Sequence, residues 1–119
     1  MLTVKKIIGN FGEELANNFL KSRGYAVIAR NKKFRRWEFD LIAEKSGQII
    51  FVEVKTLCSA INPAETCLSR RQIELLHRAM FFYCWKNKID PLKARLDFIS
   101  VNIDRAKKTA RLRHYKNIF

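Results

Sequence analysis

The sequence has no long hydrophobic run, few acidic residues, and few cysteines and histidines. A helix that spans a bilayer needs about 20 predominantly apolar residues, whereas the longest uninterrupted apolar run is Ala79–Trp85, with seven. The N-terminal segment also lacks the apolar stretch of a secretory signal peptide. We therefore expect a cytoplasmic protein that makes no use of a membrane.

The cysteine and histidine content gives no zinc-binding pattern. Cys58, Cys67 and Cys84 form no C-x-x-C pair, and the histidines are His77 and His114 alone. We expect three reduced thiols. There is no repeat, linker or low-complexity tract. A chain of 119 residues buries a core without disulfides, and we expect a single domain over residues 1–119.

The charge is strongly unbalanced. Lysine and arginine total 24 against 11 acidic residues, which gives a formal net charge of +13. Such an excess indicates a polyanionic partner, most simply nucleic acid; an acidic membrane surface or a ribosome would satisfy the same electrostatics. The candidate phosphate contacts are Arg30, Lys32, Lys33, Arg35, Arg36, Arg70 and Arg71. Phosphate contacts position a nucleic acid without reading its sequence.

Hydrophobic periodicity predicts seven elements. They are a helix over 5–22, ended by Arg23 and Gly24; strands over 25–30, 37–44 and 48–56; a helix over 69–86; and strands over 94–103 and 110–115. Residues 31–36 are predicted to be a basic loop, and residues 57–68 to be irregular around Asn62 and Pro63. The order αβββαββ predicts an α/β fold with a mixed central sheet flanked by helices.

Each predicted helix has an apolar stripe. The stripe of the first helix consists of Ile8, Phe11, Leu15 and Phe19, and that of the second of Ile73, Leu76, Met80 and Tyr83. Leu75 and Phe82 lie on the opposite side of the second helix. Two arrangements fit them: packing on another element, or packing on a second copy of the chain in a homodimer.

The run QIIFVEVK, residues 48–55, places two charged side chains in a strand that is otherwise apolar. Side chains alternate between the two faces of a strand, so Phe51, Glu53 and Lys55 share one face. In the preceding predicted strand, Glu38, Asp40 and Ile42 share one face, and Phe39, Leu41 and Ala43 the other. Burial of a charge is costly unless it is paired or bound to a metal. An ordinary salt bridge is the alternative to a functional site.

The turn between these strands decides whether the acids meet. A two-residue turn at Ser46-Gly47 pairs Lys45 with Gln48 and brings Asp40 opposite Glu53. A three-residue turn instead pairs Asp40 with Val52 and separates the acids. If the acids converge, Asp40, Glu53 and the Val54 carbonyl form a site for Mg²⁺, with Mn²⁺ as a substitute. Lys55 would orient or deprotonate an attacking water, or stabilise the transition state.

Asp40, twelve intervening residues and then Glu53-Val54-Lys55 resemble the D…ExK motif of the restriction-endonuclease-like superfamily. The sequence is more closely similar to the YraN family, small bacterial endonuclease-like proteins that resemble archaeal Holliday-junction resolvases. Matches extend over nearly the whole chain. They include Gly12-Glu13, Ala16, Arg23-Gly24-Tyr25, Arg30-Asn31, Glu38-x-Asp40-Leu41-Ile42-Ala43, Phe51-Val52, Arg95-x-Asp97 and Phe119.

The resemblance implies a restriction-endonuclease-like αβββαβ core and Mg²⁺-dependent cleavage of DNA, including branched or damaged DNA. Asp40 and Glu53 would hold the metal, and Glu13 would complete the catalytic set. Glu38 also matches, and we expect it to pair with Lys55; Asp97 would either have a structural role or support the residues that hold the metal. The chain departs from the family pattern at Trp37, where glycine is usual, and at Leu57, where arginine is usual. Both departures bear on substrate affinity: Trp37 would crowd the site or stack on a base, and Leu57 removes a phosphate contact.

Two functions therefore fit the sequence. The first is a metal-dependent nuclease acting on DNA. The second is a catalytically weak or inactive nucleic-acid-binding protein that retains the fold. The presence of Glu13, Asp40, Glu53 and Lys55 together favours the first, because a degenerate nuclease would have lost at least one of them.

Overall fold

The computed structural model of the protein describes residues 2–58 and 68–119. The elements in chain order are α1 (Val4–Ser22), β1 (Ala26–Phe34), β2 (Trp37–Lys45), β3 (Gln48–Cys58), α2 (Arg70–Lys86), the short 3₁₀ helix η2 (Pro91–Lys93), β4 (Ala94–Asp104) and β5 (Thr109–Tyr115). This order confirms the predicted α/β class. Of the segment predicted to be irregular, Leu57 and Cys58 belong to β3, and residues 59–67 lie outside the described residues.

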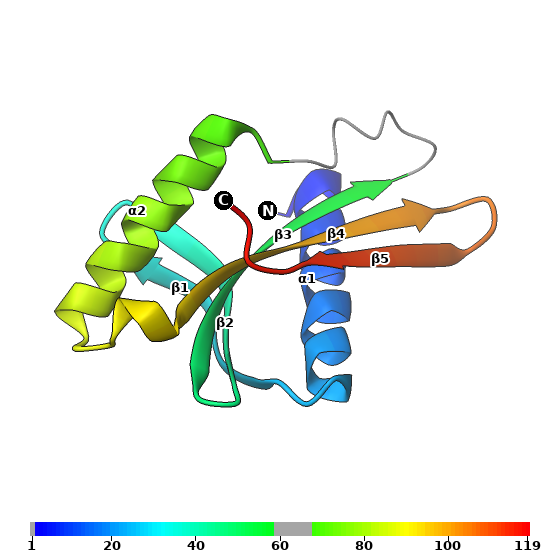
Figure 1. Ribbon diagram of the computed structural model, residues 1–119. Coiled ribbons are helices and arrows are strands. Elements are labelled where there is room, and N and C mark those ends of the chain that lie inside the picture. The colour runs from blue at the N-terminus through cyan, green and yellow to red at the C-terminus, as the bar shows by residue number, and fades with distance from the viewer. Residues whose placement is uncertain (1, 59–67) are drawn as a thin grey trace.

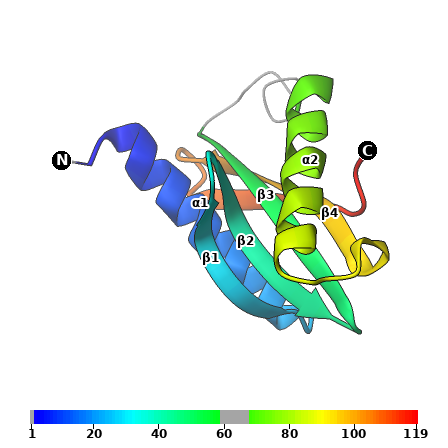
Figure 2. The same ribbon diagram turned by 90° about the vertical axis from the view of Figure 1, so that its left-hand side faces the viewer.

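The five strands form one mixed sheet in the order β1-β2-β3-β4-β5. Only β3 and β4 pair in parallel, and α2 makes the crossover between them, as parallel neighbours require. Figures 1 and 2 show α1 and α2 on opposite faces of this sheet. The middle of β3 is therefore buried on both faces: Ile50 and Val52 pack on the α1 side, and Phe51 packs on the α2 side.

The line of closest contact along α1 differs from the predicted stripe. Phe11 is 51% exposed, whereas Gly12, Ala16 and Leu20 are buried. Small residues let the helix approach the sheet closely, so the contact line follows them and Phe11 is displaced to the side. The predicted C-terminal cap is confirmed: Gly24 has φ +86°, and the Tyr25 N–H donates back to the Leu20 carbonyl.

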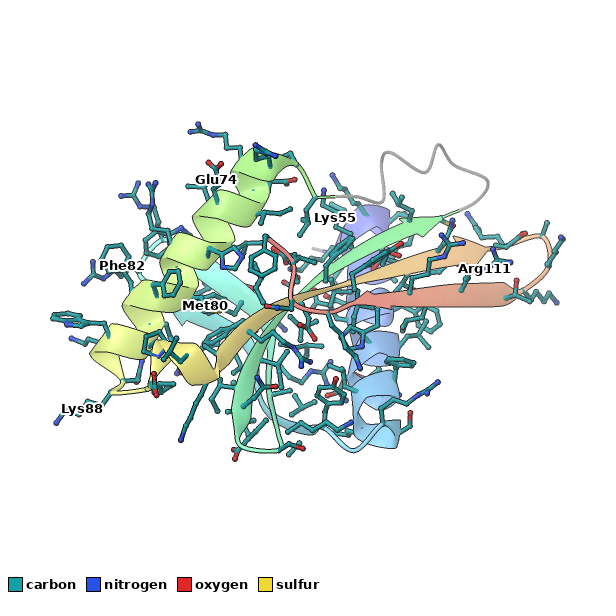
Figure 3. All side chains as sticks on the ribbon, viewed as in Figure 1. Lys55, Glu74, Met80, Phe82, Lys88 and Arg111 are labelled. Carbon is teal, nitrogen blue, oxygen red and sulfur yellow. The ribbon has the colours of Figure 1, made fainter. Side chains whose placement is uncertain are left out.

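Helix α2 packs on the sheet through Ala79, Met80 and Cys84. It begins with a capping box, in which Ser69 and Gln72 bond each other's backbone N–H groups. Leu75 and Phe82 lie on its outer side, as predicted, and both are exposed. Figure 3 shows Phe82 and Met80 on different sides of the helix.

The predicted basic loop over residues 31–36 is wrong. Strand β1 continues to Phe34, and only Arg35 and Arg36 form the turn into β2. The Trp37 ring stacks on the Phe34 ring with a centroid separation of 6.3 Å, and on the Phe82 ring of α2 with a centroid separation of 6.0 Å. Strand pairing and this aromatic packing outweigh the polar composition and fix the hairpin tip to α2.

Strands β1 and β2 are irregular where they pass Asp40. The β1–β2 register shifts between Val27 and Ala29. Further along β1, Asn31 has a φ of +49°, a conformation that asparagine tolerates better than most residues. On β2, Leu41 packs on the α1 side but Phe39 packs on the α2 side. The predicted shared face for these two residues is therefore wrong, because the strand changes its orientation at Asp40.

Candidate active site

The β2–β3 hairpin has the two-residue turn that brings the acids together. Ser46 and Gly47 both have positive φ, +51° and +78°, as a type I′ turn requires. The register runs from Lys45 opposite Gln48 to Leu41 opposite Val52. The predicted two-residue turn and its pairing of Lys45 with Gln48 are therefore confirmed, and the three-residue turn does not occur. The strand pairing itself stops one position before Asp40 and Glu53.

Asp40 lies where β2 separates from β3, and we call the opening between the two strands at Asp40 and Val54 the fork. The pairing of β2 with β3 ends at Leu41. Beyond it, the Val54 N–H of β3 points toward β2 and donates a hydrogen bond to Asp40 Oδ2 at 2.8 Å. The N–H and C=O of one strand residue point toward the same neighbouring strand, so the Val54 carbonyl also points into this fork. The fork thus combines a carboxylate with a backbone carbonyl, both suitable ligands for a hard cation.

Glu53 meets Asp40 at the fork. Burial, followed by a side-chain hydrogen bond with Asp40 and the negative charge of Asp40, raises the pKa of Glu53 to about 9. Glu53 therefore keeps its proton at neutral pH, because a second negative charge beside Asp40 is unfavourable without a compensating cation. A divalent cation would take the place of that proton, so the residues present fit a hard metal ion.

Glu13 approaches the fork because α1 crosses β3 very closely. A Cβ atom on Gly12 would overlap the side chain of Thr56, so only glycine allows this approach. Burial raises the pKa of Glu13, and the negative charge of Asp40 is the next contribution. Glu14 instead bonds Arg30 of β1 at 2.8 Å on the exposed side of the helix. The structure thus separates two glutamates that helical periodicity alone does not distinguish.

Lys55 lies on β3 beyond Glu53, opposite Ser100 of β4. Its positive charge acts to lower the pKa of Glu53, although burial and Asp40 outweigh it. Figure 3 places Lys55 on the part of β3 that runs between the N-terminal ends of the two helices. An ammonium group is therefore held close to the acidic pair.

Glu38 does not pair with Lys55 as predicted. The β2–β3 register ends at Leu41, and Glu38 lies opposite Lys33 of β1. The charge of Glu38 contributes to raising the pKa of Glu13, so it belongs to the α1 side of the site. The reason is the change of strand orientation at Asp40, which a regular alternation of side chains does not anticipate.

The acidic core consists of two carboxyl groups in contact and a third within electrostatic reach. Over residues 2–58 and 68–119, no group of three or more histidine, cysteine, aspartate or glutamate side chains is arranged to hold a metal ion. Mg²⁺ often takes only one or two protein carboxylates and completes its octahedron with water and substrate phosphate. Asp40 and Glu53 are sufficient for such a site.

Apolar residues that the sequence analysis did not connect with the site also surround the acids. Leu76 of α2, Leu96 of β4 and Phe39 line a narrow recess against Asp40 and Glu53. Apolar walls of this kind exclude water and produce the desolvation that raises the pKa of Glu53. No sequence pattern marks them, since an apolar residue beside a site looks like any other core residue.

The predicted basic residues occupy three places. Arg30, Lys32 and Lys33 lie on β1, Arg35 and Arg36 form the turn at the hairpin tip, and Arg70 and Arg71 open α2. Arg30 is engaged by Glu14. Arg35 lies over the rings of Phe34 and Phe82, with its guanidinium carbon 5.6 and 5.5 Å from the two ring centroids. Trp37 stacks within the same aromatic cluster, so its ring is held at the hairpin tip.

Asp97 is the centre of a buried network on the α1 side of the sheet. Arg95 binds it through two N–H groups at 2.8 and 2.9 Å, His114 through Nε2 at 2.7 Å, and the Asn117 N–H at 2.9 Å. Burial alone would raise the pKa of Asp97, but the hydrogen bonds from His114, Arg95 and Asn117 outweigh it and lower the pKa. This network joins β4, β5 and the last residues of the chain.

Comparison with known proteins places this site in a family. A sequence model described as "Uncharacterised protein family UPF0102" matches residues 12–101. The chain belongs to the UPF0102 family. This is the YraN family indicated by the sequence motifs. A UPF0102 protein of Flavobacterium psychrophilum is 34% identical over 113 residues, covering 94% of this chain and 92% of the relative.

Other UPF0102 proteins match at similar levels. One from Clostridium botulinum is 32% identical over 116 residues, covering 96% of this chain and 94% of the relative. One from Thermotoga petrophila is 36% identical over 89 residues, covering 75% and 81%. The family match includes Glu13, Asp40, Glu53 and Lys55. In the described part of this UPF0102 chain, no helix has the length and apolar character needed to cross a membrane.

Proposed function

We propose that this UPF0102 protein is a metal-dependent nuclease that hydrolyses phosphodiester bonds in DNA in the cytoplasm, using Mg²⁺ or, as a substitute, Mn²⁺. The observation that carries the proposal is the convergence of Asp40 and Glu53 at the fork between β2 and β3. The pairing of the two strands ends at Leu41; beyond it, Asp40 accepts from the Val54 N–H, and its carboxyl group is hydrogen-bonded with Glu53. A polar cluster of this kind in an apolar recess is costly for stability, and such a cost is typical of functional sites.

The proposed role of each site residue follows from its position in the site. Asp40, Glu53 and the Val54 carbonyl would hold the ion, which when bound supplies a water of lowered pKa and neutralises charge on the phosphate. Lys55 would orient the attacking water or donate to the phosphate oxygen that gains charge. Glu13, with its raised pKa, would accept or donate a proton at the edge of the site, opposite the recess formed by Leu76.

The charge of the chain supports DNA as the substrate. A net charge of +13 attracts a polyanion. Arg70 and Arg71 are exposed at the start of α2, the helix that contributes Leu76 to the recess, so the phosphates of a bound strand would meet cations beside the acidic pair. Binding through phosphates is expected to weaken steeply as the salt concentration rises.

The test is cleavage of branched, single-stranded and duplex DNA with Mg²⁺ or Mn²⁺ and with EDTA. Metal-dependent products should be made by the wild type and should be absent from Glu53→Gln and Lys55→Met. Glu44→Gln and Lys93→Met are matched controls, because both parent residues are exposed and lie away from the fork. They should cleave as the wild type does.

A nucleic-acid-binding protein with weak or no catalysis is the second candidate. It is favoured by the departures at Trp37 and Leu57 and by an acidic core in which only two carboxyl groups are in direct contact. DNA that stays intact under all metal conditions, together with a clear gel shift, would establish this candidate. Cleavage that persists in Glu53→Gln at the wild-type rate would refute the proposed site.

A further inference from the structure

The outer face of α2 carries aromatic side chains that the fold does not bury. Phe81, Phe82 and Trp85 are 52%, 41% and 77% exposed. With Arg78 they line a shallow hollow of about 430 Å³, which we call the α2 aromatic face. Their spacing of three and four residues places them on one side of the helix. Exposed apolar clusters of this kind mark interaction sites.

Packing on the sheet does not account for this face. The inner side of α2 is occupied by Ala79, Met80 and Cys84, and Figure 3 shows Phe82 on a different side of the helix from Met80. Phe82 is partly used, because it stacks on Trp37 with a centroid separation of 6.0 Å. Trp85 projects into solvent, beyond that contact.

The charges around the face identify the occupant. Residues 70–88 carry five cations, namely Arg70, Arg71, Arg78, Lys86 and Lys88, against the single carboxylate of Glu74, a net charge of +4 with His77 neutral. Arg35 adds a guanidinium over the Phe82 ring. Two copies of the chain joined through this face would bring like charges together. A polyanion that carries flat apolar groups matches both the cations and the rings.

We propose that the α2 aromatic face is a stacking surface for the unpaired bases of single-stranded DNA. Aromatic side chains stack on bases without sequence preference, while neighbouring cations follow the phosphates. Arg78 adds a cation within the same hollow. Bases inside an intact duplex are already stacked on one another, so the face requires a strand with unpaired bases.

The location of the face deepens the proposed nuclease function, on which this part of the inference rests. Leu76 lines the recess with Asp40 and Glu53, and Trp85 follows it on the same helix. At about 1.5 Å per residue the two are about 13.5 Å apart along the axis, and at about 3.6 residues per turn they lie on opposite sides of the helix, so a bound strand would also pass around α2. The substrate would therefore be DNA with an unpaired segment several nucleotides from the cut.

The experiment measures stacking directly and needs no cleavage. The chain has two tryptophans, so Trp37→Phe leaves Trp85 as the only indole while keeping an aromatic ring in the hairpin cluster. A single-stranded oligonucleotide added in EDTA should quench the fluorescence of Trp85. An abasic strand of the same length should quench it little, because it has the phosphates without the bases.

Affinity provides the second measurement. Trp85→Ala should weaken binding of the single-stranded oligonucleotide by about 5- to 150-fold, the loss of one stacked base. Binding of a blunt duplex should change less than twofold. Leu92→Ala is the control, because Leu92 is 90% exposed on η2, outside the face, and it should leave both affinities unchanged.

Two results would overturn the proposal. One is equal quenching by the abasic strand, with the affinity of Trp85→Ala unchanged. The other is a smaller assembly mass for Trp85→Ala in sedimentation with DNA binding intact, which would make the face an interface between copies. Stacking is measured in EDTA, and cleavage is measured separately with Mg²⁺ or Mn²⁺. Stacking without metal-dependent cleavage would refute the nuclease alone, and cleavage without stacking would refute this inference alone.

Discussion

Replacing Glu53 by glutamine is expected to stabilise the protein increasingly as the pH rises. The pKa of Glu53 is about 9 in the folded chain and 4.5 as its ordinary value. Between these values the folded state holds a proton that the unfolded state has lost. The stability that this proton contributes is fully present below about pH 4.5 and is lost as the pH rises through about 9.

The magnitude follows from the linkage relation. One proton difference changes the free energy of unfolding by about 1.36 kcal/mol per pH unit. From about pH 5.5 to about pH 7.5 the wild type should therefore lose about 2.7 kcal/mol through Glu53 alone. Glutamine has the shape of the protonated acid and donates to Asp40 without titrating, so Glu53→Gln should not show this loss.

The assay is urea unfolding in EDTA, followed by circular dichroism, at several pH values in this range. The difference in unfolding free energy between Glu53→Gln and the wild type isolates this group from all others that titrate. Glu44→Gln, at an exposed position of β2, should keep a constant difference from the wild type. If the difference for Glu53→Gln also stays constant within about 0.5 kcal/mol, Glu53 does not keep its proton across this pH range and the reasoning is wrong.

Three further predictions concern metal binding and packing. At a free Mn²⁺ concentration about 100 times its Kd, the wild type near pH 7.5 should gain about 2.7 kcal/mol, measured as a rise in melting temperature; an equal rise in Glu53→Gln would place the ion elsewhere. Gly12→Ala should cost about 1–3 kcal/mol in urea unfolding through its overlap with Thr56, and combination with Thr56→Ala should cost less than the sum of the two changes. Asp97→Asn should cost about 3–5 kcal/mol, because it leaves the Arg95 guanidinium without its carboxylate; a loss below about 1 kcal/mol would contradict a structural role.

Local chemistry made part of the site predictable. The turn residues Ser46 and Gly47 adopt positive φ, and the resulting register is a property of a few adjacent residues. Counting along that register predicts that Asp40 meets Glu53, although the pairing itself ends at Leu41 and Asp40 instead binds the Val54 N–H. Glu13 was indicated only by family resemblance, because its approach depends on how closely a helix distant in sequence packs on β3.

The errors arose where tertiary packing overrides a local pattern. Phe11 fits an apolar helical stripe, but the small side chain at Gly12 decides which line of α1 meets the sheet. The polar segment around Lys32 and Lys33 has the composition of a loop, yet pairing with β2 keeps the backbone extended to Phe34. The orientation of Phe39 depends on the irregular backbone beside Asp40, which alternation along a strand does not include.

The sheet order leaves β1 and β5 as its two edges, and both edges are cationic. An edge strand exposes unpaired backbone groups that invite pairing with another molecule, and lysine or arginine side chains discourage it. Addition of a second copy along either edge would set like charges opposite one another. The repulsion between these charges weakens as salt shortens the screening length to about 3 Å at 1 M, so concentrated salt would weaken the protection of both edges against pairing with another copy. The residues responsible are Arg30, Lys32 and Lys33 on β1, and Arg111 and Arg113 on β5.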